Sequence, residues 1–125
     1  MKKMILLYNF TPERMRLVRR AAEPLGCTVR GIPQKDFTLS VGFLTGLTQQ
    51  SDRKPTAESF NQEMLVISGL SGEGIDIFLA ALKKCGAGYI PIKAVVTETN
   101  ASWSGYELYH EIKKEHEAMS SSDKR

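Results

Sequence analysis

The chain has 125 residues, of which 42% are hydrophobic and 25% are charged, and its formal net charge is +3 at neutral pH. These values are typical of a globular protein of one domain with a core of its own, and they exclude the fibrous and disulfide-scaffold classes. No stretch approaches the roughly 18 apolar residues of a membrane-spanning helix, and so small a basic excess does not by itself indicate a nucleic-acid partner.

The beginning of the chain looks only briefly like a secretory signal. Its apolar stretch stops near Asn9 and Pro12, whereas a signal peptide needs roughly 7–15 consecutive apolar residues. The two cysteines, Cys27 and Cys85, show neither a Cys-x-x-Cys pair nor metal-ligand spacing. We therefore expect free thiols and a cytoplasmic location.

The first half of the chain predicts two strands, each followed by a helix. Residues 4–10 form an apolar run, and Thr11 can cap the helix after it, which Gly26 should end. A second strand is predicted over 27–32. A modest helix is predicted over 36–47, because its apolar residues recur at helical spacing.

The second half repeats this pattern after a polar, turn-rich segment. Residues 48–62 predict a flexible loop in which only Phe60 could act as a hydrophobic anchor. The apolar run 64–70 then matches the first run at an offset of 60 residues, and Ser71 falls on Thr11. This repeat has two interpretations, an internal duplication or the patterning that any two strand–helix units share.

Two further elements follow the apolar helical stripe of residues 75–82. A fourth strand is predicted over 89–97, and a last helix should run from about Ser104 to residue 119. The spacing Ser104-x-x-Glu107 has the form of a capping box. Residues 120–125 are polar and predict a disordered tail.

Together the elements predict a small layered α/β domain over residues 1–119, with halves 1–47 and 63–119 joined by the loop 48–62. We expect a four-stranded, mainly parallel sheet in the order 2-1-3-4, with helices on both faces. Open parallel sheets bind ligands at the carboxyl ends of their strands. In this chain those ends are residues 9–11, 68–72 and 97–103.

The strongest candidate binding site is the end of the predicted fourth strand. A lysine in an apolar strand is uncommon, since burying an ammonium group is costly, and Lys93 could hold an anion there. Each residue of this cluster also has a structural interpretation: edge protection for Lys93, a turn for Asn100 and core closure for Trp103. The candidate binding residues are Lys93, Thr97, Thr99, Asn100 and Trp103.

A weaker candidate is the glycine-rich turn between the third strand and its helix. The backbone N–H groups of Gly69, Ser71 and Gly72 could bind an anion at the helix N-terminus. The spacing is neither a dinucleotide fingerprint nor a P-loop. An ordinary turn capped by Ser71 explains the pattern more simply, and Glu73 would repel a phosphate.

No metal site, cofactor or catalytic residue is predicted. His110 and His116 are six residues apart on one predicted helix, so they do not share the face that a two-ligand metal site needs. Neither Cys27 nor Cys85 has a neighbour in sequence that would activate a thiol. The acidic residues beside the histidines have the pattern of a solvated face; they are Glu111, Glu115 and Glu117.

The first helix carries basic residues that could form a patch for RNA or for an acidic partner. No aromatic residues are interleaved among them to stack on bases, so nucleic acid is not the expected partner. These residues are Arg14, Arg16, Arg19 and Arg20.

Residues 90–103 complete a pattern that resembles a bacterial family of unknown function. Its signature joins S-G-[FL]-S, a leucine-rich helix and I-P-[IL]-K-A-V-[LV]-T-x-T-N-x-x-W, to which residues 68–71, 75–82 and 90–103 correspond. The family is found largely in Gram-positive anaerobes and gut bacteria. The resemblance implies a bacterial cytoplasmic domain and draws attention to residues 93–103, but it implies no activity, cofactor or catalytic residue.

One departure from the family bears on the glycine turn. The family usually has acidic residues where this chain has Gly72 and Gly74, so the glycines look like a local variation. This weakens the interpretation of the turn as an anion cradle.

The sequence thus predicts a non-catalytic binding or regulatory domain for a protein partner or a small anionic ligand. One alternative is a small enzyme acting on a phosphorylated or carboxylated metabolite, which requires the glycine turn and Lys93 to share one anion position. The other alternative is a homo-oligomeric structural protein, whose distinctive surface is its own interface.

Overall fold

A computed structural model describes residues 2–48 and 60–123, with side chains as far as Ala118. Most of the predicted flexible loop, residues 49–59, lies outside the described residues, as do residues 124–125 of the predicted tail.

Four strands form one mixed sheet in the order β2-β1-β3-β4, which confirms the predicted order. The strands are β1 Met4–Tyr8, β2 Thr28–Ile32, β3 Met64–Ser68 and β4 Lys93–Val95. β2 is parallel to β1 and β4 is parallel to β3, whereas the two central strands run antiparallel to each other. The sheet is therefore mainly parallel, as predicted, with one antiparallel pair at its centre.

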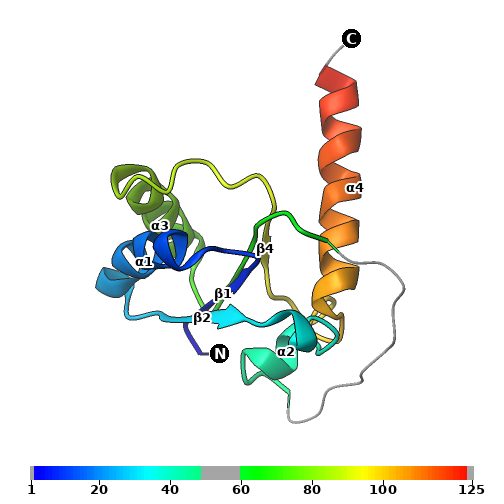
Figure 1. Cartoon of the computed structure of the whole chain (residues 1–125), viewed down its shortest axis with the longest axis horizontal. Coiled ribbons are helices and arrows are strands. Elements are labelled where there is room, and N and C mark those ends of the chain that lie inside the picture. Colours follow the sequence, from blue (N-terminus) through cyan, green and yellow to red (C-terminus); the bar gives the residue numbers. More distant parts are fainter. Residues whose placement is uncertain (1, 49–59, 124–125) are drawn as a thin grey trace.

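Helices cover both faces of this sheet, also as predicted (Figure 1). The helices are α1 Pro12–Ala22, α2 Val41–Leu44, α3 Gly72–Lys84 and α4 Gly105–Asp123, and the short 3-10 turns are η1 Glu23–Leu25 and η2 Gln34–Asp36. α1 and α3 lie on one face, where Phe78 and Leu82 of α3 pack with the sheet residues Ile5 and Leu65. α2 and α4 lie on the other face, which Leu6 and Val66 also line.

The two halves have the same order of strand, helix, strand and helix, and they meet at the antiparallel centre of the sheet. β1 and β3 are separated by 60 residues at both ends, and the helices that follow them begin at Pro12 and Gly72, again 60 apart. Leu6 and Val66, which are equivalent at this offset, are paired directly across the antiparallel ladder. The offset is not kept by the outer strands, since β4 begins 65 residues after β2, so both interpretations of the repeat stay open.

The antiparallel centre corrects one expectation from the sequence. Tyr8 at the end of β1 pairs with Met64 at the start of β3, while Ser68 at the end of β3 pairs with Met4. The carboxyl ends of the central strands therefore lie at opposite edges of the sheet. Residues 9–11 and 68–72 do not form one crevice.

Local capping chemistry defines the starts of the long helices. The hydroxyl oxygen of Thr11 accepts from the backbone N–H of Arg14 at 3.2 Å, and that of Ser71 accepts from Gly74 at 3.1 Å. At α4 the predicted capping box is reciprocal. Ser104 Oγ accepts from the Glu107 N–H, and a Glu107 carboxylate oxygen accepts from the Ser104 N–H.

Three predicted elements have different lengths in the structure. The helix predicted over 36–47 is reduced to η2 and the four-residue α2, because the backbone N–H groups of Val41 and Gly42 bond to carbonyls of the 101–103 segment instead of within a helix. The strand predicted over 89–97 is ordered as β4 only at Lys93–Val95. α4 continues to Asp123, four residues past its predicted end.

An aromatic cluster closes the core between the sheet and α4. Phe60, predicted as an anchor, is 5% exposed, and its ring stacks on that of Tyr109 with centroids 4.1 Å apart. Tyr8 and Phe37 meet edge to face at 5.0 Å. The anchored Phe60 therefore ties the chain entering β3 to the α4 side of the sheet.

Candidate functional site

An open groove of about 310 Å³ lies between β4 and α4. It is bordered by all of the binding residues proposed from the sequence, which are Lys93, Thr97, Thr99, Asn100 and Trp103. β4 forms one side, the turn after it forms the end, and Leu108, Ile112 and two glutamates of α4 form the other side. The structure thus brings together residues that are spread over 11 positions of sequence with residues from the following helix.

Thr97 and Asn100 build the turn at the end of the groove. The Asn100 side-chain oxygen accepts from the Thr97 N–H at 2.8 Å, and the Thr97 hydroxyl accepts from the Asn100 N–H at 3.2 Å. The Asn100 amide also donates to the Val95 carbonyl at 3.0 Å. These contacts match the structural interpretation of Asn100 as a turn former, and they hold the rim of the groove in place.

Trp103 and Thr99 supply the surfaces of the groove. Trp103 is partly buried and packs against the core cluster on the α4 side. Thr99 is exposed at the rim. Trp103 therefore serves the core and the groove at once, while Thr99 is available for contact from solution.

Lys93 borders the groove, but its amine is directed elsewhere. Lys93 is paired with Leu65, which belongs to the cluster on the α1–α3 face, whereas Ala94 and Trp103 pack on the α4 face. The amine donates to the Ile90 carbonyl and lies 4.3 Å from the centroid of the Tyr89 ring. Burial, reinforced by the charge of Lys83, lowers the pKa of Lys93.

The charged side chains on the helix wall of the groove are acidic. Glu111 and Glu115 line it one helical turn apart on the exposed face of α4. The sequence pattern suggested only a solvated acidic face. The four-residue spacing of Glu111 and Glu115 in a helix with a predicted cap could have shown that the two side chains share one helix face. Because the Lys93 amine contacts the Ile90 carbonyl on the opposite face of the sheet, the charges directed at the helix side of the groove come from these two glutamates.

The glycine turn lies apart from this groove. Ser71 Oγ is engaged as the α3 cap, and a side chain at Gly69 would overlap the backbone of Lys2 and Lys3, which explains its glycine. Lys93 is level with Leu65 on β3, four residues before Gly69, which places them roughly 13 Å apart along the strands. The geometry required for a shared anion position is therefore not met.

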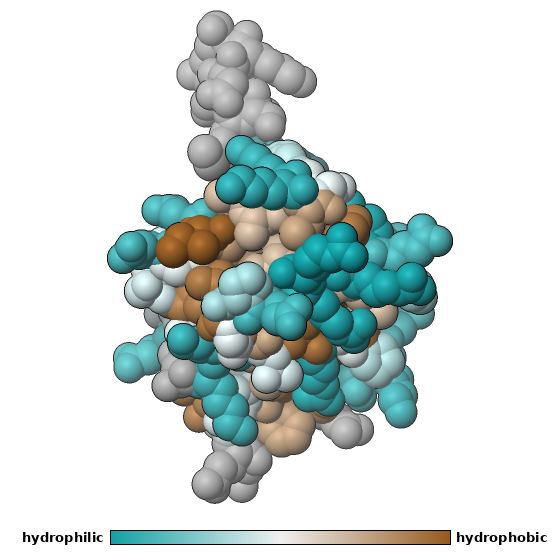
Figure 2. Space-filling model, turned by 90° about the vertical axis from the view of Figure 1, so that its left-hand side faces the viewer, coloured by the Kyte–Doolittle hydropathy of each residue, from teal (hydrophilic) through white to brown (hydrophobic). Residues whose placement is uncertain are grey.

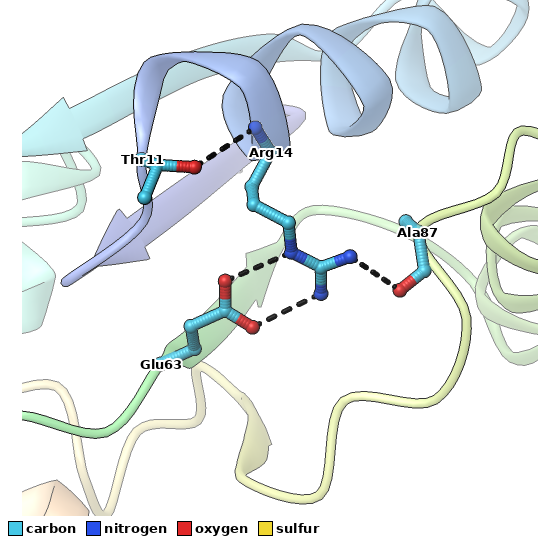
Figure 3. Close-up of polar contacts among 4 residues, drawn as sticks. All are labelled: Thr11, Arg14, Glu63 and Ala87. Carbon is cyan, nitrogen blue, oxygen red and sulfur yellow. Dashed lines mark hydrogen bonds and ion pairs between the residues drawn. The ribbon is translucent and has the colours of Figure 1, made fainter.

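Arg14, one of the basic residues of α1, is a structural contact (Figure 3). Its guanidinium donates from Nε and Nη2 to the two carboxylate oxygens of Glu63, each at 3.0 Å, and from Nη1 to the Ala87 carbonyl at 2.8 Å. The hydrogen bonds to Glu63 raise the pKa of Arg14. α1 is thereby tied both to the chain entering β3 and to the chain leaving α3.

The side of the molecule that carries α1 and α3 in Figure 1 faces the viewer in Figure 2, where hydrophilic side chains lie among apolar ones. The remaining basic residues of α1 are exposed. They are Arg16, Arg19 and Arg20. Because hydrophilic and apolar groups are mixed on this side of the molecule, it is not a uniformly basic surface.

Three further observations concern reactive groups and membranes. Burial raises the pKa of the Cys27 thiol, which is the opposite of activation. Within residues 2–48 and 60–118, no three histidine, cysteine, aspartate or glutamate side chains gather as a metal site would require. No helix in the described part of the chain combines the length and apolar character needed to cross a membrane.

Comparison with known proteins places part of the chain in a family context. Residues 63–119 match the family model described as a domain of unknown function (DUF3783), which confirms the resemblance to a family without a known function. The match spans β3, α3, β4 and the part of α4 up to residue 119, so it corresponds to the second half of the chain. No curated protein and no solved structure matches the chain.

Proposed function

We propose that the protein is a non-catalytic binding domain that receives a protein partner in the groove between β4 and α4. The observation that supports this proposal is the convergence of Thr97, Thr99, Asn100 and Trp103 on one open groove. The turn hydrogen bonds hold the rim rigidly, so little ordering would be required when a partner binds. An aromatic ring with apolar neighbours next to polar rim groups is a composition found in protein interfaces.

The protein partner is favoured over the small anionic ligand by the charges. An anion in the groove would face Glu111 and Glu115, while the Lys93 amine is engaged by the Ile90 carbonyl on the other face. The proposal also includes a bacterial cytoplasmic setting, which is supported by the two unpaired thiols of Cys27 and Cys85.

Photo-cross-linking tests the groove directly. A benzophenone amino acid is placed at exposed Thr99 and, as a control, at Ile77, which is 50% exposed on α3 away from the groove. We expect a protein that cross-links from position 99 and not from position 77. Its affinity, measured with the purified partner, should fall at least about tenfold in Thr99→Trp and stay within twofold in Ile77→Trp. Equal cross-linking from both positions, or equal affinity of both variants, would contradict the proposal.

A further inference from the structure

Among the described residues β4 is an edge strand, and the groove lies beside it. In the described sheet β4 pairs only with β3. The Ile92 carbonyl accepts from the Leu65 N–H, and the Val96 N–H donates to the Ile67 carbonyl, so residues 92 and 96 face β3. Since backbone groups alternate along a strand, those of Lys93 and Val95 point away from β3.

One of these outward groups is already capped. The Asn100 amide donates to the Val95 carbonyl at 3.0 Å, as a neighbouring strand would do. The N–H and carbonyl of Lys93 and the N–H of Val95 form no hydrogen bond with another described residue. An uncapped edge next to a preformed groove is a template for an added strand.

The walls of the groove indicate what such a strand should carry. On the α4 side it would meet Trp103, Ile112 and the carboxylates of Glu111 and Glu115. Because successive side chains of a strand point to opposite faces, only every second residue of the added strand faces these groups. A basic side chain at such a position complements the two glutamates, and an apolar one fits against Trp103.

We propose that the groove binds an extended, basic peptide segment of a partner protein, which adds to β4 as a fifth strand. This inference rests on the proposed function, which it deepens by naming the class of partner. The segment pairs with the outward groups of Lys93 and Val95, and lysine or arginine side chains on its α4-facing side pair with Glu111 and Glu115.

The test starts from a phage-displayed library of random linear twelve-residue peptides selected on the purified protein. An enriched peptide is then synthesised, and its affinity is measured by fluorescence anisotropy. We expect enriched peptides to carry lysine or arginine at alternate positions. Their affinity should decrease with added salt, since the charge pairs are at the surface.

Two matched pairs of variants separate the backbone from the charges. Val95→Pro removes the outward N–H without removing a bond to β3, and it should weaken peptide binding about tenfold. The control Val95→Thr keeps the N–H, so its affinity should stay within about twofold of the wild type. The double change Glu111→Gln with Glu115→Gln should weaken binding about tenfold. Glu117→Gln, on the same helix but outside the groove, should leave the affinity within about twofold.

A peptide modification makes the backbone test independent of protein folding. N-methylation at alternate positions of the enriched peptide should abolish binding in one register and spare it in the other, because only one set of N–H groups faces β4. Equal sensitivity at all positions would overturn strand addition.

Other outcomes distinguish the inference from the proposed function. If Thr99→Trp blocks the enriched peptide while the proline and glutamine variants bind normally, the groove binds a partner but not as a basic strand. If no peptide is enriched, or if the protein forms a dimer that Val95→Pro dissociates, the basic-peptide inference is overturned. In the dimer case the occupant of the edge is a second copy of this chain.

Discussion

Gly105 and Gly72 provide a matched test of how tightly the core is packed beneath α4. Each is the first residue of its helix and follows a serine cap, Ser104 or Ser71. A methyl group on Gly105 would lie 2.5 Å from Cε2 of the fully buried Tyr8 ring and 3.2 Å from the Phe37 carbonyl. A methyl group on Gly72 would meet nothing within 4 Å.

The two substitutions should therefore change stability in opposite directions. Gly72→Ala should stabilise the protein by about 0.4–1 kcal/mol, because alanine reduces the entropy of the unfolded chain at no steric cost. Gly105→Ala has the same entropic gain, but the Tyr8 ring contacts Phe37 and Phe60, so displacing it would disturb their packing. Overpacking of this kind costs about 1–3 kcal/mol.

Urea denaturation followed by circular dichroism measures both effects. We expect the free energy of unfolding of Gly105→Ala to lie about 1–3 kcal/mol below that of Gly72→Ala, with equal dependence on denaturant. Equal midpoints for the two variants would refute the reasoning, since they would mean that the Tyr8 ring yields to the added methyl group.

Two further predictions concern charged residues. Arg14→Ala should lower the free energy of unfolding by about 2 kcal/mol, a value between those of exposed and buried ion pairs, because the side chains of Arg14 and Glu63 are 29% and 28% exposed and the Ala87 carbonyl also loses its donor. As a control, Arg16→Ala at an exposed position of the same helix should change the free energy of unfolding by no more than about 0.5 kcal/mol. Equal losses in the two variants would contradict the structural role of Arg14. The pKa of Lys93 is lower in the folded protein than in the unfolded chain. Between these two pKa values the unfolded chain binds more protons, so the contribution of Lys93 to the free energy of unfolding rises with pH. Wild type should accordingly gain stability relative to Lys93→Met as the pH rises toward the ordinary lysine pKa of about 10.4. A difference that stays constant in denaturation experiments over this approach would show that the Lys93 pKa is not lowered.

Much of the fold follows from local sequence. Thr11, Ser71 and Ser104 cap the helices predicted from them, because a capping hydrogen bond joins residues only three positions apart. The sheet order was also predictable, since the apolar runs identify β1 and β3 as the central strands.

Other features depended on contacts between distant parts of the chain. The direction of β3 relative to β1 is expressed in long-range pairs such as Leu6 with Val66, which no local pattern specifies. The short α2 results from backbone bonds of Val41 and Gly42 to residues 103 and 101, which are distant in the sequence.

The candidate site shows the same division. The sequence by itself determined that residues 93–103 form a strand end and turn with unusual side chains. Only the tertiary structure decided that the Lys93 amine lies on the α3 face, because that orientation depends on the register of β4 against β3. Only the packing of α4 beside β4 made Glu111 and Glu115 a wall of the groove. The charge of a site depends on which elements meet there, and here long-range packing placed two glutamates beside the strand end where the sequence had suggested an anion site.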